Sequence, residues 1–339
     1  MNINQWFDKN YKKVLILPVI LIILTLAYLV LFYVQTGDII HKDISLTGGS
    51  VITVSTNISQ SEMSSLLSKN FTDFTVSAIS DNSGNQIQLV ITVPESQTGA
   101  LTSSLENIIG QKLTEKNSSV QTTSTSLSED FYKQLIVSIL LAFFWMSAVV
   151  FIIFAKGAKV KIWAVIINLL FGIFMANFFL SLNTYLALAI FVLFAVALIR
   201  LYVKNSIPAF AVMSCAFADI VMTLAIVDVI GMKLSIAGIV SFLMLIGYSV
   251  DTDVLLTSRT VKRKDRAANS AIYGAFKTGI TMTATAIVAI LTALIIVYRF
   301  QSVLNQIFII LVIGLALDVF NTWVTNVCLI KWYAETKKE

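Results

Sequence analysis

The sequence predicts a polytopic α-helical membrane protein, with about eight transmembrane helices and one extracytosolic ferredoxin-like α+β domain (βαββαβ). Two observations lead to this fold class. The chain of 339 residues is 57% hydrophobic and only 13% charged, which leaves too little polar surface for a soluble protein. Residues 35–132 differ from the rest because they are rich in Ser, Thr, Asn and Gln, as a domain in water would be.

Apolar segments of the chain are long enough to serve as membrane spans. A helix needs about 20 residues to cross roughly 30 Å of hydrocarbon. Eight segments meet this length, at residues 14–34, 133–154, 160–181, 184–203, 208–230, 235–258, 275–298 and 303–330. The later segments are separated by short gaps, so we expect neighbouring helices to run antiparallel.

Lysines and arginines orient the helices, because they are enriched in cytosolic loops. One predicted inner segment carries six of them, Arg259, Lys262, Arg263, Lys264, Arg266 and Lys277. We therefore expect a cytosolic N-terminus with the first span (1–34), an outer domain (35–132), a seven-helix bundle (133–330) and a cytosolic tail (331–339). The net charge of +5 then belongs to cytosolic loops and does not indicate binding to nucleic acid.

Inside the outer domain, runs of alternating β-branched residues are separated by helical patterns. We predict strands at 44–56, 73–80, 86–93 and 118–126 and helices at 59–69 and 95–115. The segment 81–85, DNSGN, predicts the turn between the two middle strands. The order βαββαβ is that of the ferredoxin-like split βαβ unit.

Ionisable residues within the predicted spans are functional candidates, because a charge in hydrocarbon is expensive. The candidates for a proton relay are Asp219, Asp251, Asp253, Lys277 and Asp318. Asp219 lies about 18 Å along its helix from the inner surface at 1.5 Å per residue, which is near the midplane. Asp228, at the outer end of the same helix, is expected at the membrane interface. Lys277 is a candidate for the charge that opposes the relay carboxylates.

Asp251 and Asp253 lie two residues apart in one predicted span. Two residues correspond to about 200° around a helix, so both cannot face the same neighbouring helix. Asp251 shares a face with Gly247 and Ser258. We therefore expect Asp251, rather than Asp253, to face the interior of the bundle.

A polar stripe follows one face of the last predicted span. It consists of Asp318, Asn321, Thr322, Thr325 and Asn326, with Gly314 one turn earlier. Polar groups in hydrocarbon must face other helices or water, so we expect this face to be packed inside the bundle. Amides, hydroxyls and glycines often serve only to hold helices together, but that role needs no carboxylate.

The sequence offers no sign of an enzyme, a cofactor or a metal site. It has no Gly-rich phosphate-binding loop of the ATPase type. Its single histidine, His41, and its two cysteines, Cys215 and Cys328, do not have the spacing of metal ligands or of a nucleophile and its base. Energy for any transport would then have to come from an ion gradient or from a partner.

Several motifs, in order along the chain, resemble those of the SecF family of protein-export membrane subunits. LTGGS at 46–50 is similar to the Thr-Gly-Gly signature that opens the outer domain of that family, here Thr47, Gly48 and Gly49. GYSVDTDVLLTSR at 247–259 resembles its fourth-helix segment, through Gly247, Tyr248, Ser249, Thr252 and Arg259. FADIVMTLA at 217–225 looks like its third-helix segment, in which Asp219 matches a membrane aspartate, and 276–278 looks like the start of its fifth helix.

Two departures from the family pattern affect what the resemblance implies. Bacterial members have Asn-Asp-Thr where this chain has Asp251, Thr252 and Asp253, a form that looks like the archaeal branch. The proton-coupled aspartate of the family therefore corresponds to either Asp251 or Asp253. Family members have six spans, so we expect an extra helix pair within about 155–205.

The resemblance implies a non-enzymatic auxiliary subunit of the Sec export machinery in the cell membrane. Such a subunit acts with a SecD homologue, the Sec channel subunits and a translocating polypeptide, and proton movement through buried aspartates drives its outer domain. One alternative is a stand-alone proton-driven exporter of lipids or drugs from the same resistance–nodulation–division superfamily. The other is a structural scaffold of the translocon that uses no energy.

Overall fold

The computed structural model describes residues 3–80, 85–114, 117–177, 183–262, 268–298 and 303–336. In this part of the chain, eight helices are long and apolar enough to cross a membrane, which confirms the predicted number of spans. They are α2 (Ile16–Thr36), α6 (Thr125–Phe154), α7 (Ala158–Asn177), α8 (Thr184–Asn205), α9 (Ile207–Val229), α10 (Ile236–Lys262), α11 (Ala268–Val297) and α12 (Val303–Phe320), which continues through η3 (Asn321–Asn326) into α13 (Val327–Thr336).

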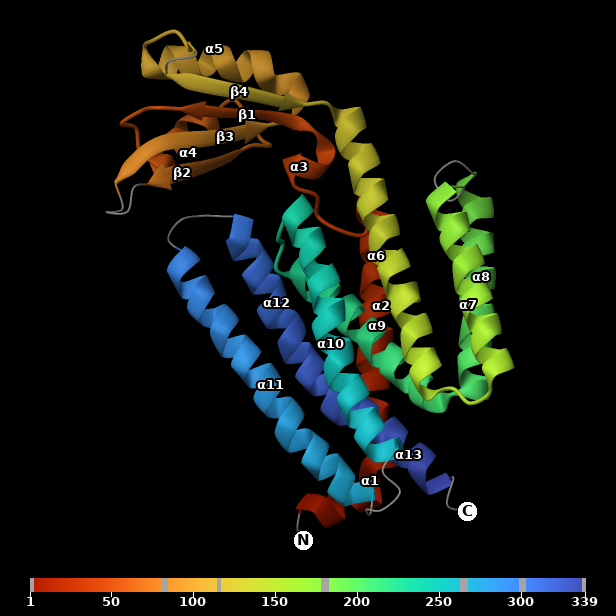
Figure 1. Cartoon of the computed structure of the whole chain (residues 1–339). Helices are drawn as coiled ribbons and strands as arrows, with labels where there is room; N and C mark the ends of the chain where they lie inside the picture. Colours follow the sequence, from red (N-terminus) through yellow and green to blue (C-terminus); the bar gives the residue numbers. More distant parts are fainter. Residues whose placement is uncertain are drawn as a thin grey trace.

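A short amphipathic helix that the sequence analysis did not predict precedes the first span. This helix, α1 (Ile3–Val14), is separated from α2 only by Leu15. Tyr11 of α1 is buried, and its hydroxyl donates a hydrogen bond of 2.5 Å to Glu335 of α13. The two ends of the chain therefore meet, and both lie at one end of the helix bundle (Figure 1).

The opposite end of the bundle carries a four-stranded sheet (Figure 1). Its elements in chain order are β1 (Gly49–Val54), α4 (Gln60–Leu67), β2 (Thr75–Ser80), β3 (Gln86–Val93), η1 (Glu95–Gln97), α5 (Thr98–Ile109) and β4 (Ser118–Thr123). The strands lie in the order β2-β3-β1-β4, and every pair of neighbours is antiparallel. This order of elements and strands is consistent with the predicted split βαβ unit.

One face of the sheet is covered by both of its helices. Alternate residues of β1 and β3 are buried, as expected when successive side chains point to opposite faces. These residues form a single apolar cluster with the inward faces of α4 and α5, made of Ile52, Val54, Met63, Leu67, Phe71, Leu89, Ile91, Val93, Leu101 and Leu105. The sheet and its two helices thus have a hydrophobic core of their own.

The first predicted strand, 44–56, is wrong in its first part. Residues 44–47 form the helical turn α3 (Ile44–Thr47), and the strand begins only at Gly49. Gly48 connects the two with φ of 82°, a conformation that glycine adopts without a steric penalty. The Thr-Gly-Gly motif is therefore the turn that leads into the sheet. Most of the turn predicted at 81–85 lies outside the described residues.

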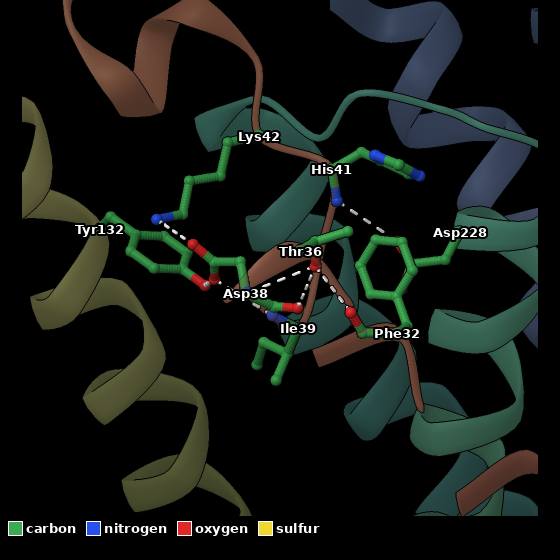
Figure 2. Close-up of polar contacts among 8 residues, drawn as sticks. All are labelled: Phe32, Thr36, Asp38, Ile39, His41, Lys42, Tyr132 and Asp228. Atoms are coloured by element: carbon green, nitrogen blue, oxygen red, sulfur yellow. Dashed lines mark hydrogen bonds and ion pairs between the residues drawn. The ribbon is translucent and has the colours of Figure 1, made fainter. Parts of the chain in front are cut away.

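The segment between α2 and the sheet is anchored to the end of the bundle that carries the sheet. Leu234, in the connection between α9 and α10, donates its N–H to the His41 carbonyl at 2.6 Å and accepts from the Asp43 N–H at 2.9 Å. Figure 2 shows the side chains beside this anchor, where Asp38 pairs with Lys42 and accepts a hydrogen bond of 3.0 Å from the Tyr132 hydroxyl. These contacts fix the base of the outer domain to α6 and to the α9–α10 connection.

Helices α9 and α10 form the centre of the bundle. Of their spans, 67% and 56% are buried, against 6% for α2 and for α11. Helices α7 and α8 form a hairpin beside α6 (Figure 1), held by aromatic contacts such as Phe144 with Phe171, whose ring centroids are 4.2 Å apart. This hairpin contains the residues expected to be an addition to the six-span pattern.

Candidate functional site

Three buried aspartates from three helices meet in the centre of the bundle. Asp219 lies on α9, Asp253 on α10 and Asp318 on α12, and each is 0% exposed. One carboxylate oxygen from each lies within 4.8 Å of the other two. At an effective dielectric constant of about 20, two unit charges about 5 Å apart repel by about 3 kcal/mol. The cluster therefore favours a state in which protons or a cation neutralise part of its charge.

Both oxygens of Asp219 accept hydrogen bonds from other helices. Ser249 on α10 donates its hydroxyl to Asp219 Oδ2 at 2.5 Å, and Asn321 in η3 donates Nδ2 to Oδ1 at 2.7 Å. Asn321 is in turn held by Thr325, whose hydroxyl lies 3.3 Å from Asn321 Oδ1. Asp219 is thus fixed in position by two neighbouring elements.

Asp253 and Asp318 share one hydroxyl group. Thr322 Oγ1 lies 2.9 Å from Asp253 Oδ1 and 3.1 Å from Asp318 Oδ1. A hydroxyl has a single hydrogen, so Thr322 can donate to only one of the two carboxylates. If the other carboxyl group carries a proton, it can donate that proton to Thr322 Oγ1 in return. The Asp253 and Asp318 carboxyl groups and the Thr322 hydroxyl can therefore share a proton while the backbone conformation stays the same.

Several oxygens around the cluster are buried and, among the described residues, have no hydrogen-bond partner. They are Asp253 Oδ2, Asp318 Oδ2 and Asn326 Oδ1. Asn326 itself lies at the site, because its Nδ2 donates to Asp253 Oδ1 at 2.7 Å. The sequence predicts no metal site, yet carboxylate and amide oxygens are ligands of hard cations. This set of atoms can accept either protons or a cation.

The polar stripe of the last span reaches the cluster from a π-helical turn, not from the regular α-helix that the sequence predicted. In η3 the Val327 N–H donates to the Thr322 carbonyl, five residues earlier. The wider turn lets the adjacent residues Asn321 and Thr322 both contact aspartates. Turns of this kind inside α-helices occur frequently at functional sites, and all four polar residues of η3 are buried.

Asp251 does not join the cluster, and the expectation that it faces the bundle interior is wrong. Its side chain is exposed, whereas Asp253 is fully buried. The inward face of α10 is set by Phe242, Ile246, Ser249 and Asp253, which are buried at helical spacing. Asp251 lies about 200° away from Asp253 around the helix. The spacing of apolar residues before Asp253 was the signal in the sequence that identifies the inward carboxylate.

Lys277 also lies away from the aspartates. Its side chain is exposed in the first half of α11, and in the described part of the chain it forms no ion pair with the cluster. The basic residue that links α10 to α11 is Arg259, which donates Nη1 to the Gly274 carbonyl and to Thr278 Oγ1, both at 2.9 Å. Arg259 thus joins the C-terminal end of α10 to the N-terminal part of α11.

Small residues allow the helices around the cluster to approach closely. A Cβ atom added at Gly314 of α12 would lie 2.5 Å from the Leu245 side chain of α10. One added at Gly279 of α11 would lie 2.5 Å from the Trp323 ring and 3.2 Å from Thr252. Close contact at these points brings α10, α11 and α12 together around the aspartates.

From the sequence alone, Ser249 is identified only as a residue of the GYS motif. In the structure it is the hydrogen-bond donor to Asp219. Its position four residues before Asp253 is the signal that could have revealed this, because residues four apart lie on one face of a helix. Gly247 and Tyr248 of the same motif are exposed, and Thr47, Gly48 and Gly49 lie at the start of the sheet, outside the bundle.

Comparison with known proteins identifies relatives by sequence. Residues 179–336 match the family model described as "Protein export membrane protein SecD/SecF, C-terminal". The protein-export membrane protein SecF of Pyrococcus furiosus is 27% identical over 332 residues, which cover 96% of this chain and 92% of the relative. The protein of the same name from Methanolacinia petrolearia is 43% identical over 146 residues, which cover 43% of this chain and 51% of that relative.

Solved structures share the fold. The crystal structure of SecDF, a translocon-associated membrane protein from Thermus thermophilus, matches with a TM-score of 0.56 and 13% identity, over 96% of this chain and 38% of that chain. SecDF in a super-membrane-facing form matches with a TM-score of 0.53 and 13% identity, over 98% of this chain and 39% of that chain. The segment that matches the family model contains Asp219, Asp253 and Asp318. Residues 179–336 thus match the SecD/SecF family of protein-export membrane proteins, and the chain as a whole is similar to archaeal proteins named SecF.

Proposed function

We propose that this chain is an auxiliary subunit of the Sec export machinery that assists polypeptide translocation across the cell membrane. The family and the names of its relatives support this role. The chain spans 38% of the length of the solved SecDF chain, and the proposed partner is a SecD homologue that corresponds to the rest of that chain. The Sec channel and the emerging polypeptide are the further partners of the proposal.

The proposed orientation places residues 35–132 outside and both termini in the cytosol. The sheet and the two termini lie at opposite ends of the bundle (Figure 1), as this orientation requires. The inner ends of the spans carry basic residues such as Lys159, Arg259 and Lys331, in agreement with the enrichment of positive charge in cytosolic regions. The sheet would then meet polypeptides on the outer surface.

The observation that carries the mechanism is the arrangement of Asp219, Asp253 and Asp318 around one hydroxyl-rich turn. Three carboxylates within 4.8 Å cannot all be ionised without strong repulsion, and Thr322 has one hydrogen for two of them. Binding and release of a proton at these aspartates would therefore change the electrostatic interactions between α9, α10 and α12. In the proposed mechanism the proton gradient drives the subunit through this change.

A continuous set of contacts connects the cluster to the outer domain. Asp253 lies on α10, and the residue that anchors the outer segment, Leu234, lies just before the first turn of the same helix. Leu234 holds His41 and Asp43 through main-chain hydrogen bonds, and Asp43 leads directly into α3 and β1. A shift of α10 would thus be transmitted to the sheet through the backbone.

Protein export in cells tests this function. The Asp219→Asn variant keeps the shape of the side chain but removes its ability to exchange a proton, so we expect the export rate of a secreted protein to fall in pulse-chase labelling. Asp130→Asn is the matched control, because Asp130 is an exposed carboxylate whose side chain is 70% accessible. Membrane levels of both variants are measured by immunoblot.

The alternatives predict other results in the same strains. A structural scaffold predicts normal export in Asp219→Asn, Asp253→Asn and Asp318→Asn, and slow export only when the chain is deleted. A stand-alone exporter of the same superfamily predicts that affinity purification from native membranes in mild detergent recovers the chain without a SecD homologue or channel subunits. Recovery of those partners, together with slow export in Asp219→Asn, supports the proposed function.

A further inference from the structure

Three acceptor sequences for N-linked glycans, Asn-X-Ser/Thr, lie in the outer domain. They begin at Asn57, Asn70 and Asn117, and the rest of the sequence contains none. Such a sequence supplies an asparagine amide, which takes the sugar, and a hydroxyl two residues later. Because Ser and Thr are abundant in this domain, the motif also arises there by chance. The accessibility of the amide and of the hydroxyl in the folded domain distinguishes the three sequences.

The amide of Asn117 is engaged in a turn. Its Oδ1 accepts hydrogen bonds from the Thr114 N–H at 2.7 Å and from Thr114 Oγ1 at 3.2 Å. Its Nδ2 donates to the Lys112 carbonyl at 3.0 Å. The side chain is only partly exposed, and the Asn117 carbonyl accepts from the Ser55 N–H at 3.0 Å. A transferase would have to break this turn to reach the Asn117 amide.

At Asn57 the hydroxyl, rather than the amide, is engaged. Asn57 is exposed, but Ser59, two residues later, is the N-cap of α4. The Ser59 hydroxyl accepts a hydrogen bond of 3.3 Å from the Glu62 N–H and lies 3.2 Å from the Ser61 hydroxyl. Loss of an N-cap bond destabilises a helix. Recognition of the Ser59 hydroxyl by a transferase would therefore compete with the first turn of α4.

Asn70 lies in the connection between α4 and β2 of the outer domain (Figure 1). Asn70 and Thr72 are both exposed. Among the residues that the structure describes, neither the Asn70 side-chain amide nor the Thr72 hydroxyl has a hydrogen-bond partner. Phe71 between them is 6% exposed and packs in the core of the sheet and its helices. This sequence thus presents both its amide and its hydroxyl to solvent.

We propose that Asn70 is an N-glycosylation site, and that its sugar comes from a donor in which an oligosaccharide is linked to a polyisoprenyl phosphate. In the transfer, Asn70 Nδ2 forms a bond to C1 of the first sugar and loses one proton to a base of the transferase. The bond between C1 and the phosphate oxygen breaks, and the phosphate leaves with the electron pair. No oxidant or reductant is needed. The inference rests on the proposed orientation of the chain, in which residues 35–132 lie outside.

The folded domain can carry a glycan at Asn70 without rearrangement. The main-chain N–H groups of Asn70 and Phe71 both donate to the Leu67 carbonyl, at 3.0 and 2.9 Å, and these bonds do not involve the side-chain amide. Three residues later, Asp73 pairs with Lys233 of the α9–α10 connection at 3.0 Å. The glycan would therefore lie beside the contact between the outer domain and the bundle.

Mass spectrometry of glycopeptides tests the site. The full-length tagged chain is purified from its native membranes, digested with proteases and analysed for the peptides that contain Asn57, Asn70 and Asn117. We expect a glycan on the Asn70 peptide and no glycan on the other two. An unmodified Asn70 peptide would overturn the proposal. A glycan on Asn57 or Asn117 at equal or higher occupancy would overturn it as well.

Substitutions at Thr72 test recognition of the acceptor sequence. Thr72→Ala keeps the Asn70 amide but removes the hydroxyl, so we expect loss of the glycan, whereas Thr72→Ser should retain it. Asn70→Gln should increase the mobility of the chain in gel electrophoresis, and Asn117→Gln should leave it unchanged. Immunoblots compare the membrane levels of the variants. Glycan occupancy that is the same in Thr72→Ala as in the unaltered chain would contradict the proposal.

Cysteine labelling in intact cells distinguishes this proposal from the proposed function. Ser103→Cys places a thiol at an exposed position of α5 in the same domain, and the native Cys215 and Cys328 are buried. If a membrane-impermeant maleimide labels position 103 and Asn70 carries no glycan, the proposed orientation stands and the glycan site is wrong. If position 103 is labelled only after the membranes are opened, the proposed orientation and the glycan site both fail.

Discussion

The Ser249 hydroxyl on α10 donates a hydrogen bond of 2.5 Å to Asp219 Oδ2 on α9. Both residues are almost completely buried, at 1% and 0% exposure. This bond connects the GYS motif to the aspartate that the sequence placed near the membrane midplane. It also makes α9 and α10, the two most buried spans, depend on one another.

Ser249→Ala should destabilise the bundle. Removal of the hydroxyl leaves a buried carboxylate oxygen without a donor, which costs about 1–3 kcal/mol. Thermal unfolding of the purified protein in detergent measures the effect. Ser258→Ala is the control, because among the residues that the structure describes the Ser258 hydroxyl bonds only to the Leu255 carbonyl of its own helix. Equal melting temperatures for the two variants would show that the Ser249 bond contributes nothing.

Gly279→Ala should lower stability, whereas Gly274→Ala on the same helix should not. A methyl group at Gly279 would lie 2.5 Å from the Trp323 ring, which already packs against Phe276 at a centroid distance of 4.9 Å. Such overpacking typically costs about 1–3 kcal/mol. A methyl group at Gly274 would meet nothing within 4 Å, and alanine favours the helix by about 0.5–1 kcal/mol. Opposite shifts in melting temperature are therefore expected.

A crosslink between positions 73 and 233 should block movement of the outer domain relative to the α9–α10 connection. Lys233 Nζ lies 3.0 Å from Asp73 Oδ1, and both side chains are about half exposed. We expect a reducible crosslinker between Asp73→Cys and Lys233→Cys to slow export, and a reductant to restore it. The native Cys215 and Cys328 are buried, so they need not be replaced.

Two results would argue against movement at this point. Normal export by the crosslinked protein would show that the sheet does not separate from the α9–α10 connection during translocation. Equally slow export in both single-cysteine variants would show that the ion pair itself is required. Since exposed ion pairs contribute about 0–1 kcal/mol, we expect the single variants to export normally.

Asp38→Ala should loosen the base of the outer domain. Asp38 pairs with Lys42 and accepts from the Tyr132 hydroxyl, and Lys42 lies over the Tyr132 ring at 4.2 Å from its centroid. Loss of this partly exposed network should destabilise the segment by about 1 kcal/mol. Limited proteolysis between α2 and β1 should become faster. Asp130→Ala, which removes a surface pair with Lys133 at 3.9 Å, should leave the cleavage rate unchanged.

The eight spans could be predicted because hydropathy over about 20 residues reflects transfer of each helix into lipid and needs no tertiary contact. The strands β2 and β3 were predicted for a similar reason, since alternation within one strand identifies its buried face. Residues 44–47 were assigned to a strand, although their short apolar pattern fits a strand and a helical turn equally well. Their helical turn depends on Gly48 and on the anchor at Leu234.

The site was only partly predictable from the sequence. Asp219 was identified because a carboxylate so far from either end of a span is unusual. The choice between Asp251 and Asp253 depended on which face of α10 meets α9 and α12. Asp251 was chosen because it shares a face with Gly247, but Gly247 lies on the exposed face of the helix. The π-helical turn cannot be recognised from the local sequence. The contacts of its side chains, such as that of Asn321 with Asp219, are made with other helices.

The π-helical turn has a consequence for the assignment of equivalent residues in other proteins. Each hydrogen-bonded turn of a π-helix contains one more residue than a turn of an α-helix. Against a relative that is α-helical here, an ungapped alignment that is correct at Asp318 would be out of register from Val327 onward. Each later side chain, including those of Cys328 and Lys331, would then point about 100° away from its apparent counterpart. Placing the one-residue gap within Asn321–Asn326 brings both halves of the helix back into spatial correspondence.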